Sequence, residues 1–205
     1  MAKLFCVMGK SASGKDTVFK ALVNDPELKL NTVIPYTTRP IRDGEAEGVE
    51  YYFVDEQTFC CLKAEGNIIE ERAYHTVHGL WRYFTADDGQ IDFSKGNFII
   101  IGTLEVYEQM LAHFGCEKVV PIYINVEDGL RLMRALQREM QQKEPKYAEL
   151  CRRFLADCED FSEEKLKACE IERVYENLSM DSCLQEIKKD ILKLIDGKGY
   201  LDGKF

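Results

Sequence analysis

The pattern that most constrains the fold of this chain lies in residues 1–17. A short apolar run at 3–8 (KLFCVM) precedes a glycine-bearing loop at 9–15 (GKSASGK), and apolar positions at helical spacing follow the loop. The apolar run predicts a buried strand, and the spacing after the loop predicts a helix. Strand, loop ending in Gly-Lys, and helix form the layout of a P-loop. We therefore expect an α/β fold whose first loop binds phosphate.

The residue types in this loop suit the binding of a nucleoside triphosphate. Gly9 and Gly14 let the backbone turn so that N–H groups point at phosphate oxygens, and Lys15 supplies a cation. Asp16 stands where the usual motif has Ser or Thr, so its carboxylate is the candidate ligand for Mg²⁺. The alternative is a glycine turn beside a surface lysine. The predicted ATP-binding residues here are Gly9, Lys10, Ser11, Ala12, Ser13, Gly14, Lys15, Asp16 and Thr17.

Composition limits the class of protein and its partners. The chain has 205 residues, 45% of them hydrophobic and 31% charged, which suits one globular domain with inserted lobes. No apolar run approaches the ~20 residues that span a bilayer, so we expect a cytoplasmic protein that does not contact a membrane. The net charge of −9 argues against nucleic acid as a partner. We expect small-molecule nucleotides as partners, and a monomer or homodimer.

The eight cysteines form no CxxC pair and no metal-ligand spacing. Several stand where apolar residues pack, so we expect reduced thiols rather than disulfides.

A second informative segment is 36–53 (YTTRPIRDGEAEGVEYYF), which has no helical period and concentrates arginine and tyrosine. Arg39 and Arg42 on a proline-stiffened loop can fork onto one phosphate, with bidentate geometry that lysine lacks. Tyr51 can add a hydroxyl donor, and Glu45 can hold an arginine in orientation. A solvated charged turn before a strand is the alternative.

This segment, a short distance after a P-loop, resembles the GMP-phosphate segment of guanylate kinases, and the resemblance covers nearly the whole chain. It implies a P-loop NTPase three-layer fold with a parallel sheet, an inserted NMP-binding lobe and a helical lid. It also implies ATP with Mg²⁺ as the phosphoryl donor and GMP or dGMP as the acceptor. The implied NMP-binding residues are Arg39, Arg42, Glu45, Tyr51, Glu70, Tyr83 and Thr85.

The resemblance gives several of these residues individual roles. Glu70 accepts from the guanine N1 and N2 donors, Tyr83 is the phosphate-binding tyrosine, and Thr85 lies near the base. His78 with the following glycine is the alternative to Tyr83. Asn177 matches the asparagine that contacts adenine.

The sequence also departs from the family pattern. Pro35 stands where the family has a serine that contacts guanine, and Ile101 and Thr103 stand where it has an Asp-x-Asp pattern. The resemblance further implies a helix between Thr85 and Gly96.

A third informative segment, 126–161, predicts two helices around a polar break at 141–146. Arg131, Arg134 and Arg138 share one face of the first helix, and Arg152 and Arg153 lie on the second. Arginines that converge on a hinged helix pair are typical of a nucleoside monophosphate kinase lid, although a charged surface hairpin is the alternative. The predicted catalytic residues are Lys15, Arg134, Arg138 and Arg153.

Further apolar runs predict strands at 31–36, 67–71, 97–102, 118–124 and 172–177, and helices separate most of them. The expected organisation is a single domain, 1–205. Its core covers about 1–34, 96–130 and 168–196, its NMP-binding lobe about 35–95, and its lid about 131–160.

The leading hypothesis is phosphoryl transfer from ATP to a nucleoside 5′-monophosphate. One alternative is a sugar-phosphate kinase that resembles ribose 1,5-bisphosphate phosphokinases, because those relatives share the Gly-Lys-Asp loop. The other is a non-catalytic guanylate-kinase-like domain that binds peptides through the same cleft.

Overall fold

The protein is described by a computed structural model over residues 1–76 and 79–197. A five-stranded parallel sheet lies at its centre, in the order β2-β7-β1-β8-β9. Its strands are β1 (Leu4–Met8), β2 (Asn31–Thr32), β7 (Phe98–Gly102), β8 (Val119–Asn125) and β9 (Val174–Glu176). Strands buried on both faces read as continuous apolar runs, which is why β1, β7 and β8 were evident in the sequence.

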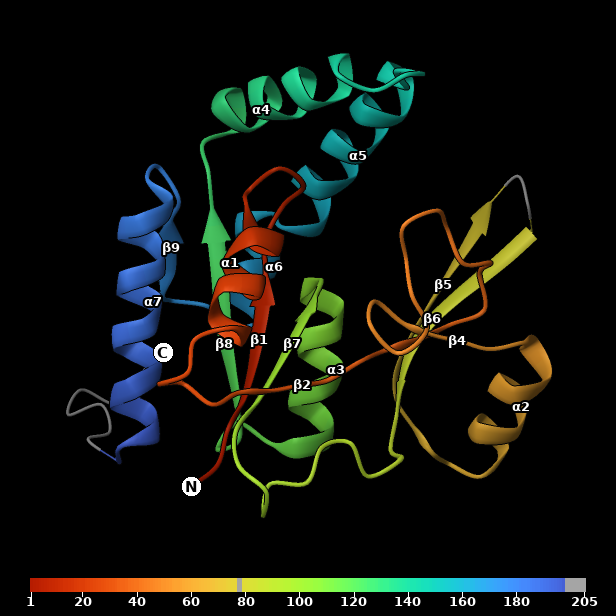
Figure 1. Cartoon of the computed structure of the whole chain (residues 1–205), viewed down its shortest axis with the longest axis vertical. Helices are drawn as coiled ribbons and strands as arrows, with labels where there is room; N and C mark the ends of the chain where they lie inside the picture. Colours follow the sequence, from red (N-terminus) through yellow and green to blue (C-terminus); the bar gives the residue numbers. More distant parts are fainter. Residues whose placement is uncertain (77–78, 198–205) are drawn as a thin grey trace.

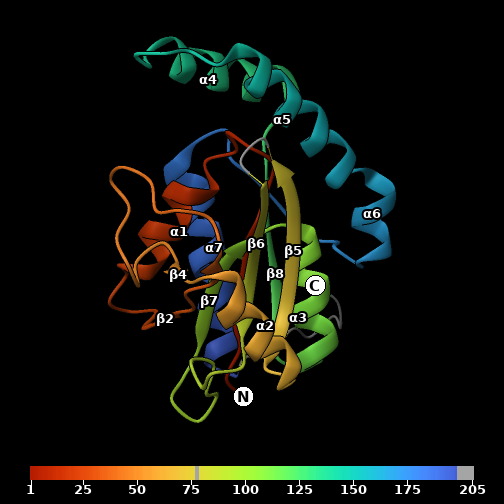
Figure 2. The same cartoon turned by 90° about the vertical axis from the view of Figure 1, so that its right-hand side faces the viewer.

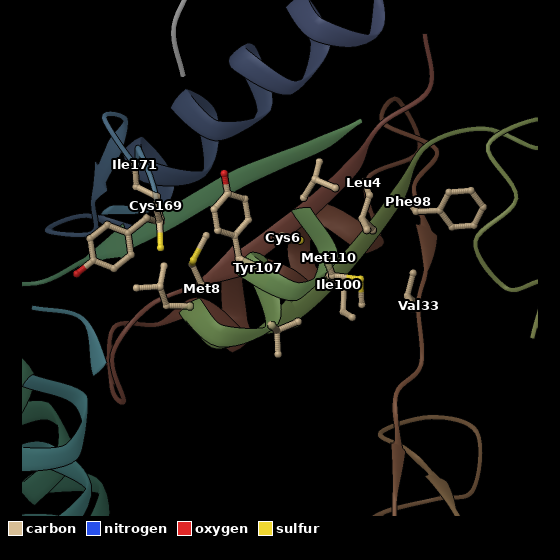
Figure 3. Close-up of a cluster of buried hydrophobic side chains, with 14 of the residues drawn as sticks. Leu4, Cys6, Met8, Val33, Phe98, Ile100, Tyr107, Met110, Cys169 and Ile171 are labelled. Carbon is tan, nitrogen blue, oxygen red and sulfur yellow. The ribbon is translucent and has the colours of Figure 1, made fainter. Parts of the chain in front are cut away.

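Helices cover both faces of this sheet (Figure 1). Leu4, Cys6 and Met8 pack in one hydrophobic cluster with α3 (Leu104–Phe114), part of which Figure 3 shows. Phe5 and Val7 point to the other face and pack with α1 (Lys15–Val23) and α7 (Met180–Ile195). The alternation of side chains along β1 thus divides the core into two halves. The three-layer α/β fold expected from the sequence is confirmed.

A second, four-stranded sheet lies to one side of the core, in the order β4-β3-β6-β5 (Figure 1). It comprises β3 (Tyr36–Thr37), β4 (Tyr52–Phe53), β5 (Ile68–Thr76) and β6 (Gly79–Ala86). The helix α2 (Glu56–Ala64) is capped at its N-terminus by Asp55, whose side chain accepts from the Thr58 N–H. Phe59 of this helix packs against Phe84 of β6, with ring centroids 5.0 Å apart.

A helical hairpin extends beyond the core on the side where the P-loop lies (Figure 2). It consists of α4 (Asp128–Met140) and α5 (Tyr147–Asp160), and the short α6 (Glu163–Ala168) leads back to the sheet. No helix within the described ranges is long and apolar enough to cross a membrane.

Two local expectations differ from the structure. The strand expected at 31–36 is divided into β2 and β3, which join different sheets. Pro35 lies between them, and proline has no N–H to donate to a ladder. No helix forms between Thr85 and Gly96. Asp88 and Asp92 there accept from the N–H groups of Gln90 and Ser94, and such local bonds favour turns over helix.

Candidate active site

The P-loop connects β1 to α1, and its two glycines cannot be replaced without a clash. A Cβ atom on Gly9 would lie 2.4 Å from the Ile124 backbone oxygen. Gly14 has a left-handed φ of 86° and immediately precedes α1. The loop therefore passes close to β8 before it reaches α1. Its backbone N–H groups lie at the N-terminus of this helix, where anions are favoured.

The side chain of Asn177 holds this loop by a hydrogen bond to its backbone. Its side-chain N–H donates to the Ser13 backbone oxygen at 2.8 Å, and the residue is 2% exposed. Arg134, which we predicted to be catalytic, donates from Nη2 to the Asn177 backbone oxygen at 3.1 Å. Both side chains thus support the P-loop. Contact between Asn177 and adenine stays a prediction.

A cavity of about 290 Å³ opens between the P-loop and the helical hairpin. We call it the donor cavity. Lys15 and Asp16 line it on the α1 side, while Arg138 and Arg153 line it from α4 and α5. Arg131 and Lys146 also line this cavity, so five cationic side chains face one space. Ser11 and Ala12 complete the loop side.

The hairpin is fastened to the P-loop by charged groups. The Ser11 backbone N–H donates to Asp157 Oδ2 of α5 at 2.8 Å. Arg131, which is 1% exposed, pairs with Asp157 at 3.2 Å and with Asp128 at 2.9 Å. Lys10 also pairs with Asp128, at 3.2 Å. A carboxylate of the hairpin thus already occupies one backbone donor of the loop.

In the 36–53 segment, Glu45 holds Arg39 by a bidentate pair. The guanidinium donates to Glu45 from Nη1 at 2.7 Å and from Nη2 at 2.6 Å, and the Arg39 side chain is 2% exposed. Arg39 Cζ also lies 5.0 Å from the ring centroid of Tyr51. The bond to Arg39 keeps the pKa of Glu45 below its ordinary value. Arg39 therefore packs against Tyr51, and it is not among the residues that line the donor cavity or the cavity described next.

In front of Tyr51 lies a second cavity, of about 740 Å³, which we call the acceptor cavity. Its volume lies within the range of small-molecule sites. It is lined by Arg42, Tyr51, Arg72, Tyr74, His75, Thr76, Trp81, Tyr83, Glu149 and Arg152. Arg42, Tyr51 and Tyr83 were predicted to bind the acceptor, and the structure brings all three to this cavity.

Glu70 and Thr85, predicted at the base end of this site, are cross-strand partners on β5 and β6. The Thr85 hydroxyl donates to Glu70 Oε1 at 2.9 Å. Arg72 donates to the same carboxylate from Nε at 3.1 Å and from Nη2 at 3.4 Å. Glu70 is 1% exposed, so Arg72 lies between this carboxylate and the acceptor cavity.

Glu149 lines both cavities. Its Oε1 accepts from Arg153 Nε at 2.8 Å, and Arg152 donates to Oε2 from Nε at 2.7 Å. The bonds from Arg152 and then Arg153 lower the pKa of Glu149 to about 2. The Glu149 carboxylate therefore holds Arg153 in the lining of the donor cavity and Arg152 in the lining of the acceptor cavity.

His78, the alternative to Tyr83, lies outside the described residues. Thr17 is exposed on α1. Where the family pattern has aspartates, Thr103 caps α3 and Ile101 lines an apolar cleft beside α1. We did not single out Glu149 or Arg72, although the spacing of Glu149 to the two arginines on one helix was a usable signal.

Asp16 is the candidate magnesium ligand that the chain offers. Its carboxylate is 75% exposed, lines the donor cavity and lies 3.6 Å from Lys15 Nζ. Over the ranges 1–76 and 79–197, no group of three or more His, Cys, Asp or Glu side chains is placed to hold a metal ion. Mg²⁺ in nucleotide sites is held by one or two carboxylates together with phosphates and water. The single carboxylate of Asp16 therefore fits a Mg²⁺ ion that is bound together with a nucleotide.

The arrangement of these elements defines the fold. A P-loop at the carboxyl end of the central strand of a parallel sheet, with helices on both faces, makes a P-loop NTPase fold, to which an inserted sheet and a helical hairpin are added. The solved guanylate kinase from Anaplasma phagocytophilum superposes with a TM-score of 0.63 over 95% of this chain and 86% of that chain, at 19% sequence identity. That likeness shows the fold.

Sequence comparisons are more specific for the N-terminal part. The guanylate kinase family model matches residues 1–83. The guanylate kinase of Tropheryma whipplei (strain Twist) is 41% identical over 83 residues, which are 40% of each chain. That of Coxiella burnetii (strain RSA 493 / Nine Mile phase I) is 38% identical over 78 residues, 38% of this chain and 37% of the relative. The match thus spans about 40% of the length of these relatives.

Residues 1–83 of the chain are thus similar in sequence to guanylate kinases, and the chain shares the fold of a solved guanylate kinase. The matched segment contains the P-loop and the whole 36–53 segment on which the resemblance was based. Neither the sugar-phosphate kinase nor the peptide-binding alternative is favoured by these comparisons.

Proposed function

We propose that this chain is an enzyme that transfers the γ-phosphoryl group of ATP to GMP or dGMP. The observation that carries the proposal is the pair of basic cavities that share Glu149, one of them built on the P-loop. Two anions bound in these cavities would meet near Glu149, and phosphoryl transfer needs them in line with their charge neutralised.

The acceptor phosphate is already an anion, so the reaction needs no strong general base. An acceptor phosphate oxygen attacks the γ-phosphorus as the bond from that phosphorus to the β-phosphate oxygen breaks, and ADP leaves. Lys15, Arg138 and Arg153 neutralise the phosphoryl group in transit, a role supported by their position in the lining of the donor cavity. Arg42, Tyr51 and Tyr83 hold the acceptor, with Arg39 and Glu45 behind them.

Mg²⁺ bound with ATP would reduce the repulsion between the two phosphates, with Asp16 as the ligand from the protein. We assign residues of about 35–95 as the acceptor lobe, about 131–160 as the lid, and the rest as the core. A cytoplasmic location, nucleotide rather than nucleic-acid partners, and a monomer or homodimer remain part of the proposal.

A coupled assay with ATP, Mg²⁺ and GMP tests the proposal. Wild-type protein should form GDP, and Lys15→Ala should lower kcat by about 100-fold or more, because it removes a charge that stabilises the transition state. Lys20→Ala is the matched control, since Lys20 lies further along the same helix outside the donor cavity. Substantial turnover by Lys15→Ala would show that the P-loop is not catalytic, and no GDP from the wild type would refute the proposed reaction.

A further inference from the structure

A carboxylate of the helical hairpin lies where the P-loop offers a donor to an anion. Asp157 Oδ2 of α5 accepts from the Ser11 backbone N–H at 2.8 Å, across 146 positions of the chain. Ser11 lines the donor cavity and belongs to the loop whose backbone N–H groups suit phosphate. Carboxylate and phosphate oxygens are both anionic acceptors that form charge-assisted bonds with such groups. Asp157 and the phosphates of a nucleotide are therefore alternative partners of the same loop.

The same carboxylate balances the charge of Arg131 on α4. Arg131 Nη1 donates to Asp157 Oδ2 at 3.2 Å, while Nε and Nη2 donate to Asp128 Oδ1 at 3.1 and 2.9 Å. The Arg131 guanidinium also lies over the ring of Phe154, with Cζ 4.1 Å from the ring centroid. Arg131 lines the donor cavity, yet it is 1% exposed. Its positive charge is therefore directed to two carboxylates of the hairpin rather than to the space in the cavity.

A single oxygen atom connects these two observations. Asp157 Oδ2 accepts both from the Ser11 N–H and from Arg131 Nη1. A phosphate oxygen at the position of Oδ2 would receive the same two bonds, so neither donor would be left unsatisfied by the exchange. The Asp157 side chain is 18% exposed, so its carboxylate can turn to water when it is displaced. Displacing Asp157 therefore leaves the loop, Arg131 and the carboxylate itself with partners.

We propose that Asp157 is an internal competitor of the donor nucleotide, and that the phosphate chain replaces it at Ser11 and Arg131. This inference rests on the proposed function, because it concerns the ligand of the donor cavity. Asp157 lowers the affinity for that ligand and keeps the charge of Arg131 neutralised until a phosphate takes its place. Arg131 then becomes a further phosphate-binding cation of the donor cavity. Asp157 acts through Ser11 and Arg131 and does not itself contact the nucleotide.

Binding measured by calorimetry tests this in the full chain. The ligands are ATP with Mg²⁺ and inorganic tripolyphosphate, which presents the phosphate chain alone. Asp157→Asn keeps the size of the side chain and removes its charge, so the Kd of both ligands should fall by about 10-fold. Asp157→Ala, which removes the acceptor and favours helix, should shift both Kd values in the same direction.

Asp160→Asn is the matched control. Asp160 also lies on α5, but its carboxylate pairs with Lys165 at 3.7 Å and is 58% exposed. The control should change either Kd by less than about twofold, because an exposed pair contributes little. If the Asp157 variants bind both ligands no more tightly than Asp160→Asn, Asp157 is not a competitor and the inference fails. In that case ATP binding by the wild type still supports the proposed function.

Initial rates separate competition from a purely structural role of Asp157. A competitor of ATP that is removed should lower the KM for ATP by about 10-fold and leave kcat and the KM for GMP unchanged. A rise in the KM for ATP together with a fall in kcat would show instead that Asp157 only seats the hairpin, and would overturn the inference. If the wild type binds neither ATP nor tripolyphosphate, the proposed function fails and this inference fails with it.

Discussion

The clearest consequence of the acceptor-site geometry concerns Glu45. Glu45→Gln keeps the size of the side chain but removes the charge that faces Arg39, whose guanidinium is 2% exposed. Glu45 accepts both Arg39 bonds, at 2.7 and 2.6 Å, and also the Arg42 backbone N–H at 2.9 Å. The glutamine amide retains one oxygen and turns its N–H groups toward the second donor.

Breaking a buried ion pair at one partner costs about 3–5 kcal/mol. Glu45 is 17% exposed, so water screens part of that loss, and we expect about 3 kcal/mol, the lower limit of the range. For a domain of this size, about 3 kcal/mol corresponds to a fall in Tm of roughly 6–12 °C. The KM for GMP should rise as well, because Arg39 supports Tyr51, and the KM for ATP should not change.

The pH dependence gives an additional test with a defined sign. Arg39 lowers the pKa of Glu45 in the folded protein below the ordinary value of 4.5. The contribution of this carboxylate is therefore complete above its unfolded pKa and is lost as the pH falls through the folded pKa. The difference in unfolding free energy between wild type and Glu45→Gln should shrink below a pH of about 4.5.

Urea denaturation followed by circular dichroism measures this difference in unfolding free energy. The control is Glu163→Gln, since Glu163 pairs with Lys167 at 3.8 Å on the surface of α6 and is 90% exposed. The control should change stability by less than about 0.5 kcal/mol. A loss in Glu45→Gln no larger than in this control, at every pH, would refute the reasoning.

Two further predictions concern the P-loop and the junction of the cavities. Asn177→Ala removes the bond to Ser13 and leaves a buried carbonyl unsatisfied, so the unfolding free energy should fall by about 1–3 kcal/mol and the KM for ATP should rise. Urea denaturation and initial rates measure both, and unchanged values would exclude this supporting role. Glu149→Gln should lower kcat, because Arg152 and Arg153 lose the carboxylate that directs them. Since the pKa of Glu149 is about 2, a wild-type pH–rate profile should show no acid limb from this group above pH ~3.

The sequence predicted the core of the fold because its signals there are local. The apolar runs that became β1, β7 and β8, and the glycine loop before α1, are each set by neighbouring residues. The inserted sheet was harder, because β5 and β6 pair with each other along most of their length and their polarity alternates weakly. The helix expected between Thr85 and Gly96 was wrong, since aspartates there favour turns.

The candidate site was predictable as a set of residue types but not as a set of contacts. The sequence suggested that Glu45 orients an arginine, and the structure identifies that arginine as Arg39. The sequence did not indicate that the Ser11 N–H donates to Asp157, because those residues are distant in the chain. The position of Arg72 over Glu70 likewise depends on how β5 turns its side chains at the bulge between Ile68 and Glu70.

The central claim is that two phosphate-bearing ligands meet between the P-loop and Arg42. The most direct test is calorimetry with adenosine and guanosine joined through their 5′ positions by five phosphates, a molecule that fills both cavities at once. We predict one molecule bound per chain, more tightly than ATP or GMP alone, and displaced by either nucleotide. Displacement by only one of the two nucleotides, or affinity no better than that of ATP, would contradict the account.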